Sequence, residues 1–214
     1  MAADVSGALR VFSLACDYIR RAGLQSEVEW QRGVTIDSFG ESEFLRESAW
    51  VILCSGFRES IVRRVFDYIS LCFCDWESSA AIVEVESLCV TSASRTFRNE
   101  AKLNAILSIA QMVHRTGFSA VKEAVLADPI AELCRLSFIG PTTVWHLAKN
   151  LGLDVAKPDR HLVRIARQFG FGGAAQLCAA LAEASGEQAK VVDLIIWRYL
   201  ADNPALRDVS IKYY

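Results

Sequence analysis

The residues best placed to do chemistry in this chain lie between positions 136 and 164. Asp159 follows Pro158, whose ring forces the residue before it to be extended, and it stands where a helix is expected to begin. Upstream, Gly140 and Pro141 predict a tight hairpin and the start of another helix, which Gly152 is placed to end in a left-handed cap. Backbone N–H groups at a helix start can bind phosphate. A phosphate-sized hairpin followed by a pre-positioned carboxylate favours DNA chemistry over simple DNA binding.

Two motifs in this stretch resemble a known family. The segment LSFIGPTT at 136–143 resembles the hairpin of the helix-hairpin-helix DNA glycosylases, the endonuclease III superfamily. The segment KPDRHLVR at 157–164 resembles the aspartate motif of that family, and weaker resemblance extends from about 42 to 197. The resemblance implies an all-α fold of two helical lobes, with a DNA-binding cleft between them and the helix-hairpin-helix motif at their junction. Residues 40–153 would form the central lobe, and residues 1–39 plus 154–214 the second lobe, made of both termini.

Asp159 is the residue that we predict to be catalytic. An Asp after Pro at a helix start is usually a structural cap, but the hairpin upstream favours a catalytic role here. Cleavage of an N-glycosidic bond builds positive charge on the sugar, which a fixed carboxylate can stabilise while it orients or activates water. We therefore predict a monofunctional DNA glycosylase, a hydrolase of base excision that flips a modified base out of duplex DNA and cleaves its N-glycosidic bond.

Several alternatives stay open. The enzyme could serve DNA repair, or it could act on hypermodified bases of phage DNA as an antiviral defence factor. A non-catalytic helix-hairpin-helix module would bind DNA without chemistry, and a purely helical interaction protein would not bind DNA at all. Base release from a lesion duplex separates the first two from the third, and the absence of salt-dependent DNA binding would identify the fourth. The base itself is not identified by the sequence.

The resemblance implies DNA contacts at the hairpin and around the aspartate. These contacts would be made by Phe138, Ile139, Gly140, Thr142, Lys157, Arg160 and Arg164. It also implies a structural monovalent cation, K⁺ or Na⁺, at the hairpin backbone. Relatives that cut the DNA strand carry a lysine where this chain has Thr142, so we expect no AP-lyase activity, with Lys149 and Lys157 weighed as substitutes.

The remaining candidate site residues are aromatic or polar. Phe57, in a turn after Gly56, is our candidate for the wedge that fills the gap left by a flipped base, and stapling two helices is the alternative. The candidates for the base pocket are Thr142, Trp145, His146 and Trp197. Core packing is the alternative for the tryptophans, because aromatic residues are usually buried.

Bulk properties narrow the class of protein. The chain has 214 residues, of which 52% are hydrophobic, and this composition is too apolar for a disordered protein. Its net charge of −2 argues against a large non-specific footprint on nucleic acid. Seven scattered cysteines without a C-x-x-C pattern favour reduced thiols over a disulfide framework, and nothing after Cys178 could bind an iron–sulfur cluster. We expect no other cofactor, signal peptide or membrane span. The prediction is a cytoplasmic monomer, nucleoid-associated if bacterial, whose partner is double-stranded DNA with a modified base.

Hydrophobic periodicity is helical nearly throughout. The predicted helices cover 6–22, 41–55, 58–74, 98–116, 118–127, 129–136, 141–151, 160–169, 174–184 and 187–201. Residues 80–90 are ambiguous between a helix and a short strand.

Overall fold

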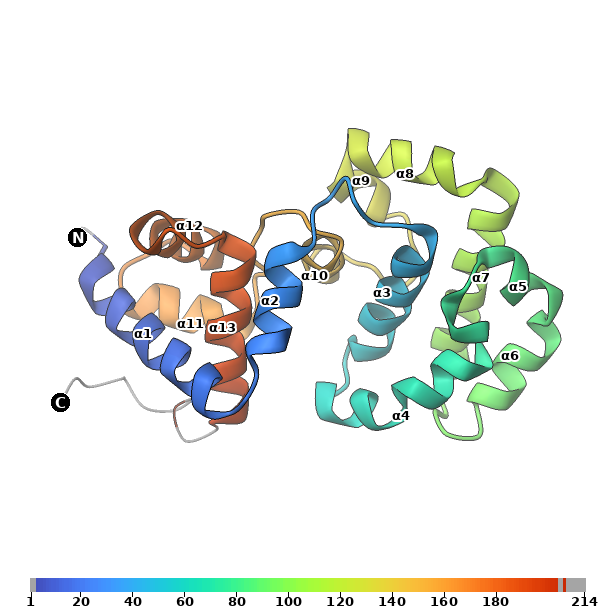
Figure 1. The fold of residues 1–214 in the computed structure, drawn as a ribbon, viewed down its shortest axis with the longest axis horizontal. Helices are drawn as coiled ribbons and strands as arrows, with labels where there is room; N and C mark the ends of the chain where they lie inside the picture. The colour runs from blue at the N-terminus through green and yellow to red at the C-terminus, as the bar shows by residue number, and fades with distance from the viewer. Residues whose placement is uncertain (1–2, 204–205, 207–214) are drawn as a thin grey trace. The chain divides into compact units, whose positions relative to one another are not determined.

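The structure is a computed structural model that describes residues 3–203 and 206. Within these residues the chain forms thirteen α-helices, one short 3-10 helix and no strand, so the predicted all-α class is confirmed for this part of the chain (Figure 1). The chain divides into two compact units. One contains residues 1–34 and 152–214, and the other contains residues 35–151.

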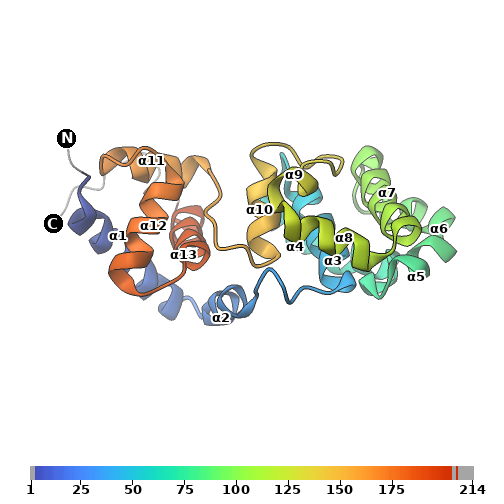
Figure 2. The same cartoon turned by 90° about the horizontal axis from the view of Figure 1, so that it is seen from above.

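The first unit combines helices from both ends of the chain around one apolar core. Val11 and Ala15 are four positions apart and therefore lie on the same side of their helix, and so do Val192 and Ile196. All four side chains belong to this core. Figure 2 shows α12 beside α1 and α13, which agrees with the contacts between them. The helices of this unit are α1 (Val5–Arg21), α2 (Gln25–Gly33), α11 (Arg160–Gln168), α12 (Ala174–Ser185) and α13 (Ala189–Asp202).

The second unit is built around α3, which packs against α4, α7 and α10. Its side chains Phe44, Ile52 and Leu53 are fully buried. Around it, α5 and α6 lie against α7 (Figure 2). The elements of this unit are α3 (Glu41–Cys54), α4 (Glu59–Cys72), η1 (Cys74–Trp76), α5 (Ser79–Glu84), α6 (Glu86–Ala93), α7 (Glu100–Thr116), α8 (Phe118–Ala127), α9 (Pro129–Leu133) and α10 (Thr143–Asn150).

The ambiguous segment 80–90 is helical. Ser78 caps α5 by accepting a hydrogen bond from the backbone N–H of Ala81 at 3.1 Å. The chain then breaks at Val85 and continues as α6. Ile82 in α5 and Cys89 in α6 are both fully buried, so each of these short helices turns one side toward the core.

Several helix predictions differ from the structure at their ends, and two differences are the largest. Helix α2 was not predicted, because its sequence QSEVEWQRG is mostly polar and only Val28 and Gln31 are buried. Helix α9 ends at Leu133 instead of residue 136, because the chain tightens there: the N–H of Leu136 donates to the carbonyl of Leu133 at 3.2 Å, an i→i−3 bond.

The chain passes between the two units after Val34 and before Gly152. Both positions are held by Lys190 of α13, whose ammonium donates to the carbonyl oxygen of Val34 and, at 3.4 Å, to that of Gly152. Burial lowers the pKa of Lys190. The backbone N–H of Lys190 also donates to Asp154 at 2.9 Å. One buried side chain therefore ties together the two segments that flank the second unit.

Candidate functional site

The turn between α9 and α10 has an unusual backbone at Phe138. Its φ is 65°, in the left-handed region that bulky residues rarely adopt. The N–H of Ile139 closes the turn on the carbonyl of Leu136 at 3.0 Å, and the carbonyl of Gly140 accepts the N–H of Val144 at 2.9 Å. The close turn was assigned to Gly140 from the sequence, but a Cβ there would meet nothing within 4 Å. The residue under conformational constraint is Phe138.

Side chains of this turn differ sharply in exposure. Phe138 is 45% exposed and Thr142 is also exposed, whereas Ile139 is only 3% exposed and belongs to the core. Helix α10 begins at Thr143, two residues after Pro141, and Thr142 is its N-cap without a side-chain capping bond. The turn therefore presents Phe138, Thr142 and backbone atoms at its surface, while Ile139 anchors it.

The segment from Gly152 to Asp159 is extended and held along its length. Gly152 has a φ of 101° and follows the end of α10, as expected of a left-handed cap. The N–H of Lys157 donates to a carboxylate oxygen of buried Asp193 at 2.6 Å, and the carbonyl of Lys157 accepts the N–H of Asp159 at 2.7 Å. Asp193 was not predicted as a site residue. It fixes the backbone two residues before Asp159.

Asp159 is the N-cap of α11, as predicted. Its φ and ψ of −72° and 147° are extended, and its Oδ1 accepts the backbone N–H of His161 at 2.8 Å. The side chain is half-buried. Because Oδ1 is committed to the cap, the carboxylate group has a fixed orientation at the positive end of the helix dipole.

Basic side chains surround Asp159 in the sequence and in α11. Arg160 is exposed, and Lys157 and Arg164 are half-buried. The Nη2 atom of Arg164 is buried and has no hydrogen-bond partner within the described residues. An unsatisfied guanidinium nitrogen destabilises a fold, so this position is energetically unfavourable.

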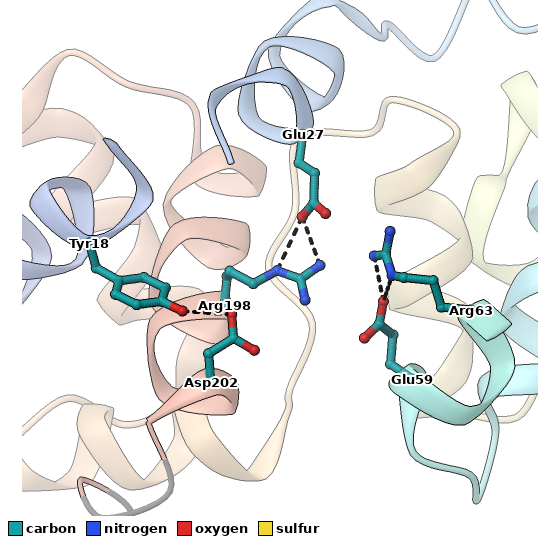
Figure 3. A network of polar contacts seen from close by, with 6 residues as sticks. All are labelled: Tyr18, Glu27, Glu59, Arg63, Arg198 and Asp202. Carbon is teal, nitrogen blue, oxygen red and sulfur yellow. Dashed lines mark hydrogen bonds and ion pairs between the residues drawn. The ribbon is translucent and has the colours of Figure 1, made fainter. Parts of the chain in front are cut away.

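The predicted pocket residues come from both units. Trp145 and His146 lie on α10 and are half-buried, whereas Trp197 lies on α13 in the other unit. The guanidinium of Arg198 lies 4.9 Å from the centroid of the Trp197 ring. Figure 3 shows the same guanidinium donating twice to Glu27, through Nε at 3.1 Å and Nη2 at 2.7 Å. Trp197 is thus part of a cation–aromatic contact within its own unit.

The far end of α10 makes a polar contact that the sequence did not predict. Asn150 is buried and its Nδ2 donates at 2.8 Å to the carboxylate of Glu47 on α3, which also accepts from Arg46 at 2.6 Å. Burial raises the pKa of Glu47 above its usual value. Position 47 lies three residues after buried Phe44, on the apolar face of α3, and that spacing was the available signal.

Phe57 lies in the turn between α3 and α4, after Gly56, whose φ is 77°. It is 41% exposed, and its ring centroid lies 5.1 Å from that of buried Phe97. Phe57 thus packs against Phe97 and is partly exposed, and its role as a wedge stays a prediction.

Lys102 on α7 is a buried residue that lies near both the turn that holds Phe57 and the turn that holds Phe138. Its ammonium donates to the carbonyl oxygens of Ile52 at 2.6 Å, Leu53 at 3.1 Å and Ser55, at the end of α3. Burial lowers its pKa. The Nζ atom lies 4.8 Å from the Phe57 ring centroid and 5.9 Å from that of Phe138. A lysine on the apolar face of α7, four residues before Ile106, was the signal for its burial.

Other basic residues are already engaged in ion pairs. Arg63 on α4 donates through Nε to Glu59 at 2.6 Å, one turn away, as Figure 3 shows. The second basic group of the sequence, at 58, 63 and 64, is therefore partly neutralised.

The described residues contain neither a candidate metal site nor a helix that could cross a membrane. No group of three or more His, Cys, Asp or Glu side chains there could hold a metal ion, and no helix there is long and apolar enough to cross a membrane. Comparison of the chain with protein-family models, with curated proteins and with solved structures also found no match.

Proposed function

We propose that this protein is a monofunctional DNA glycosylase that removes a modified base from duplex DNA by hydrolysis. The observation that carries the proposal is Asp159, a carboxylate fixed at the start of α11 by its bond to the His161 N–H. Its backbone is held in turn through Lys157 by Asp193. A carboxylate oriented before the substrate arrives can stabilise developing charge without reorganisation.

The reaction breaks the bond between the sugar C1′ and the base nitrogen, and the electron pair leaves with the base. The sugar becomes cationic as this bond lengthens, and the carboxylate of Asp159 stabilises that charge. A water oriented by the same carboxylate then adds its oxygen to C1′ and loses a proton to Asp159, from which it passes to solvent. The leaving base takes up a proton from solvent, so the products are the neutral free base and an intact strand with an abasic sugar.

Contacts to the DNA backbone would come from the turn at 138–142 and from the basic residues around Asp159. Thr142 and Arg160 are exposed and can reach phosphate oxygens. A monovalent cation at the turn would be held by backbone carbonyl oxygens. Those of Leu136 and Gly140 each accept one backbone hydrogen bond and keep a second lone pair. The proposed mechanism has no step through this cation.

Strand cleavage by a lysine amine is not part of the proposal. Thr142 cannot form an imine. Lys149, one of the two substitutes, is only 5% exposed on α10, so its amine is not available to attack a sugar. Lys157 lies on the extended segment with its backbone bound to Asp193, and we assign it to phosphate contact.

A single assay tests the proposal. Duplexes carrying oxidised, alkylated, deaminated or mispaired bases, together with phage DNAs carrying bulky modified bases, are incubated with the protein, and base release is scored with and without alkali. We expect strand breaks at one class of base only after alkali. No base release from any substrate, combined with salt-dependent DNA binding, would replace the enzyme with a non-catalytic DNA-binding module.

A further inference from the structure

Two exposed phenylalanines each lie near one buried ammonium in the second unit. Phe57 comes from the turn after α3 and Phe138 from the turn before α10, so they are distant in the sequence. Both rings lie within 6 Å of the Nζ of Lys102, at 4.8 Å and 5.9 Å. A cation at this distance from an aromatic ring attracts the ring and restricts its position.

Lys102 cannot itself be a DNA contact. The side chain is 4% exposed, and its ammonium donates to carbonyl oxygens of Ile52, Leu53 and Ser55. These bonds commit the ammonium to the end of α3, immediately before Phe57. Lys102 therefore acts on the surface only through the two rings that it touches.

Phe138 is exposed at a backbone position that favours glycine. Its φ of 65° is unfavourable for an aromatic residue, and close to half of the residue remains exposed to solvent. Neither backbone strain nor an exposed apolar ring stabilises the fold. Within the described residues the ring has one cation–π contact, with the ammonium of Lys102, and its exposed part is left for a ligand to cover.

We propose that Phe57 and Phe138 form a two-ring platform on which nucleobases of bound DNA stack, and that Lys102 is the positioning residue for both rings. This inference rests on the proposed function for the identity of the ligand as DNA. Phe138 lies in the same turn as exposed Thr142, so a phosphate held at this turn brings the adjoining bases to the ring. Stacking on an aromatic side chain is tolerant of sequence, which suits a residue that supports the duplex around a flipped base.

The experiment uses a duplex with an abasic-site analogue, which contains no bond to hydrolyse, flanked by the fluorescent base 2-aminopurine. Binding and fluorescence are measured for the full chain and for Phe57→Leu, Phe138→Gly and Lys102→Met. Leu71→Ala is the control, because Leu71 is an exposed apolar residue on α4, 67% exposed. Thermal unfolding is measured for every variant.

We expect Phe138→Gly to weaken binding about tenfold, the scale of losing one base–aromatic stack, and to change the 2-aminopurine signal. The same variant should unfold at an equal or higher temperature, because glycine suits a φ of 65°. High salt should reduce the affinity of both proteins but leave the ratio between the affinities of the unaltered protein and Phe138→Gly unchanged, because stacking is not ionic. Leu71→Ala should bind as the unaltered protein does.

Lys102→Met tests the positioning role through non-additivity. It should weaken binding in the unaltered background but much less in Phe138→Gly, because one ring that it positions is already absent. Equal losses in both backgrounds would show that Lys102 only stabilises the fold.

The platform is overturned if Phe138→Gly binds the abasic duplex normally, with or without a fall in thermal stability. Normal thermal stability would then leave the exposed rings to a protein partner, and lower stability would make Phe138 a packing residue. Base release bears separately on the proposed function. If the unaltered protein releases a base and Phe138→Gly binds normally, only the platform is refuted. If Phe138→Gly binds weakly and the unaltered protein releases no base, only the proposed enzymatic activity is refuted.

Discussion

Replacement of Asp159 by Asn and by Ala separates the two roles that this carboxylate has in the structure. Its Oδ1 atom caps α11 through the N–H of His161, and its charge is proposed to stabilise the cationic sugar. Asn retains an oxygen that can accept the capping bond but carries no charge. Ala retains neither. The two variants should therefore differ in stability and agree in activity.

The magnitudes follow from these two contributions. Asn and Asp are nearly equal as N-caps, so Asp159→Asn should change the free energy of unfolding by only a few tenths of a kcal/mol. Asp159→Ala should lose about 1 kcal/mol, which lowers the melting temperature of a chain of this size by about 2–4 °C. Base release should fall by at least about 10²-fold in both, because preorganised electrostatic groups contribute on that scale.

The assay is single-turnover base release from the duplex that the unaltered protein cleaves, developed with alkali. Affinity for the same duplex is measured at fixed salt, and thermal unfolding is followed by circular dichroism. Asp154→Asn is the matched control, since Asp154 is a carboxylate of the same extended segment that accepts the N–H of Lys190. We expect this control to retain base release close to that of the unaltered protein.

Near-normal turnover by Asp159→Asn would refute the catalytic assignment and leave Asp159 as a helix cap. A large loss of DNA affinity in Asp159→Asn would also contradict the reasoning, because the charge is needed only as the sugar becomes cationic. Equal losses in Asp154→Asn would point to the fold of the segment instead of the chemistry of one carboxylate.

Four further predictions concern the turn, the buried acids and the lysines. Gly140→Glu should weaken binding to all duplexes alike without lowering thermal stability, because its Cβ meets nothing within 4 Å; unchanged affinity at low salt would show that the turn does not contact phosphate. Asp193→Ala should slow base release while Asp193→Asn, which can still accept the N–H of Lys157, should preserve it; equal rates in single-turnover assays would show that this bond does not position Asp159. Glu47→Gln should lose less stability than the unaltered protein as pH rises above 4.5, because burial raises the pKa of the Glu47 carboxyl in the folded state; an identical pH dependence of the two melting temperatures from pH 4 to 7 would contradict this. Borohydride should trap no protein–DNA adduct, and an adduct lost in Lys149→Ala would establish lyase activity.

The sequence predicted features that depend on neighbouring residues. Asp159 caps α11, and Gly152 follows α10 with a positive φ. Helix α8 covers the predicted residues, 118–127. Caps and turns are decided within a few positions of the chain, so their residue types carry enough information. The catalytic role of Asp159, the wedge and the pocket are properties of a complex with DNA and stay predictions.

Contacts between distant residues were not predicted. The burial of Lys102 follows from its place on the apolar face of α7, but nothing local indicates that its partners are carbonyl oxygens at the end of α3. The bond from Lys157 to Asp193 spans α11 and α12, and both partners are of types common at surfaces. Such pairs are determined by tertiary packing, which periodicity does not describe.

Local preference and structure disagree at η1, where Cys74, Asp75 and Trp76 have positive φ, and in the segments where the DNA contacts are proposed. An aromatic residue in the left-handed region costs about 1–3 kcal/mol, and the buried Nη2 of Arg164, which has no partner among the described residues, also disfavours the fold. A sequence selected for stability alone would have glycine at 138 and an apolar residue at 164. Departures of this kind are expected where function requires the side chain. Trp76 has a similar positive φ but is buried in the core, so packing offsets its cost. Phe138 is 45% exposed and has no such burial, and we therefore propose a functional origin for its cost.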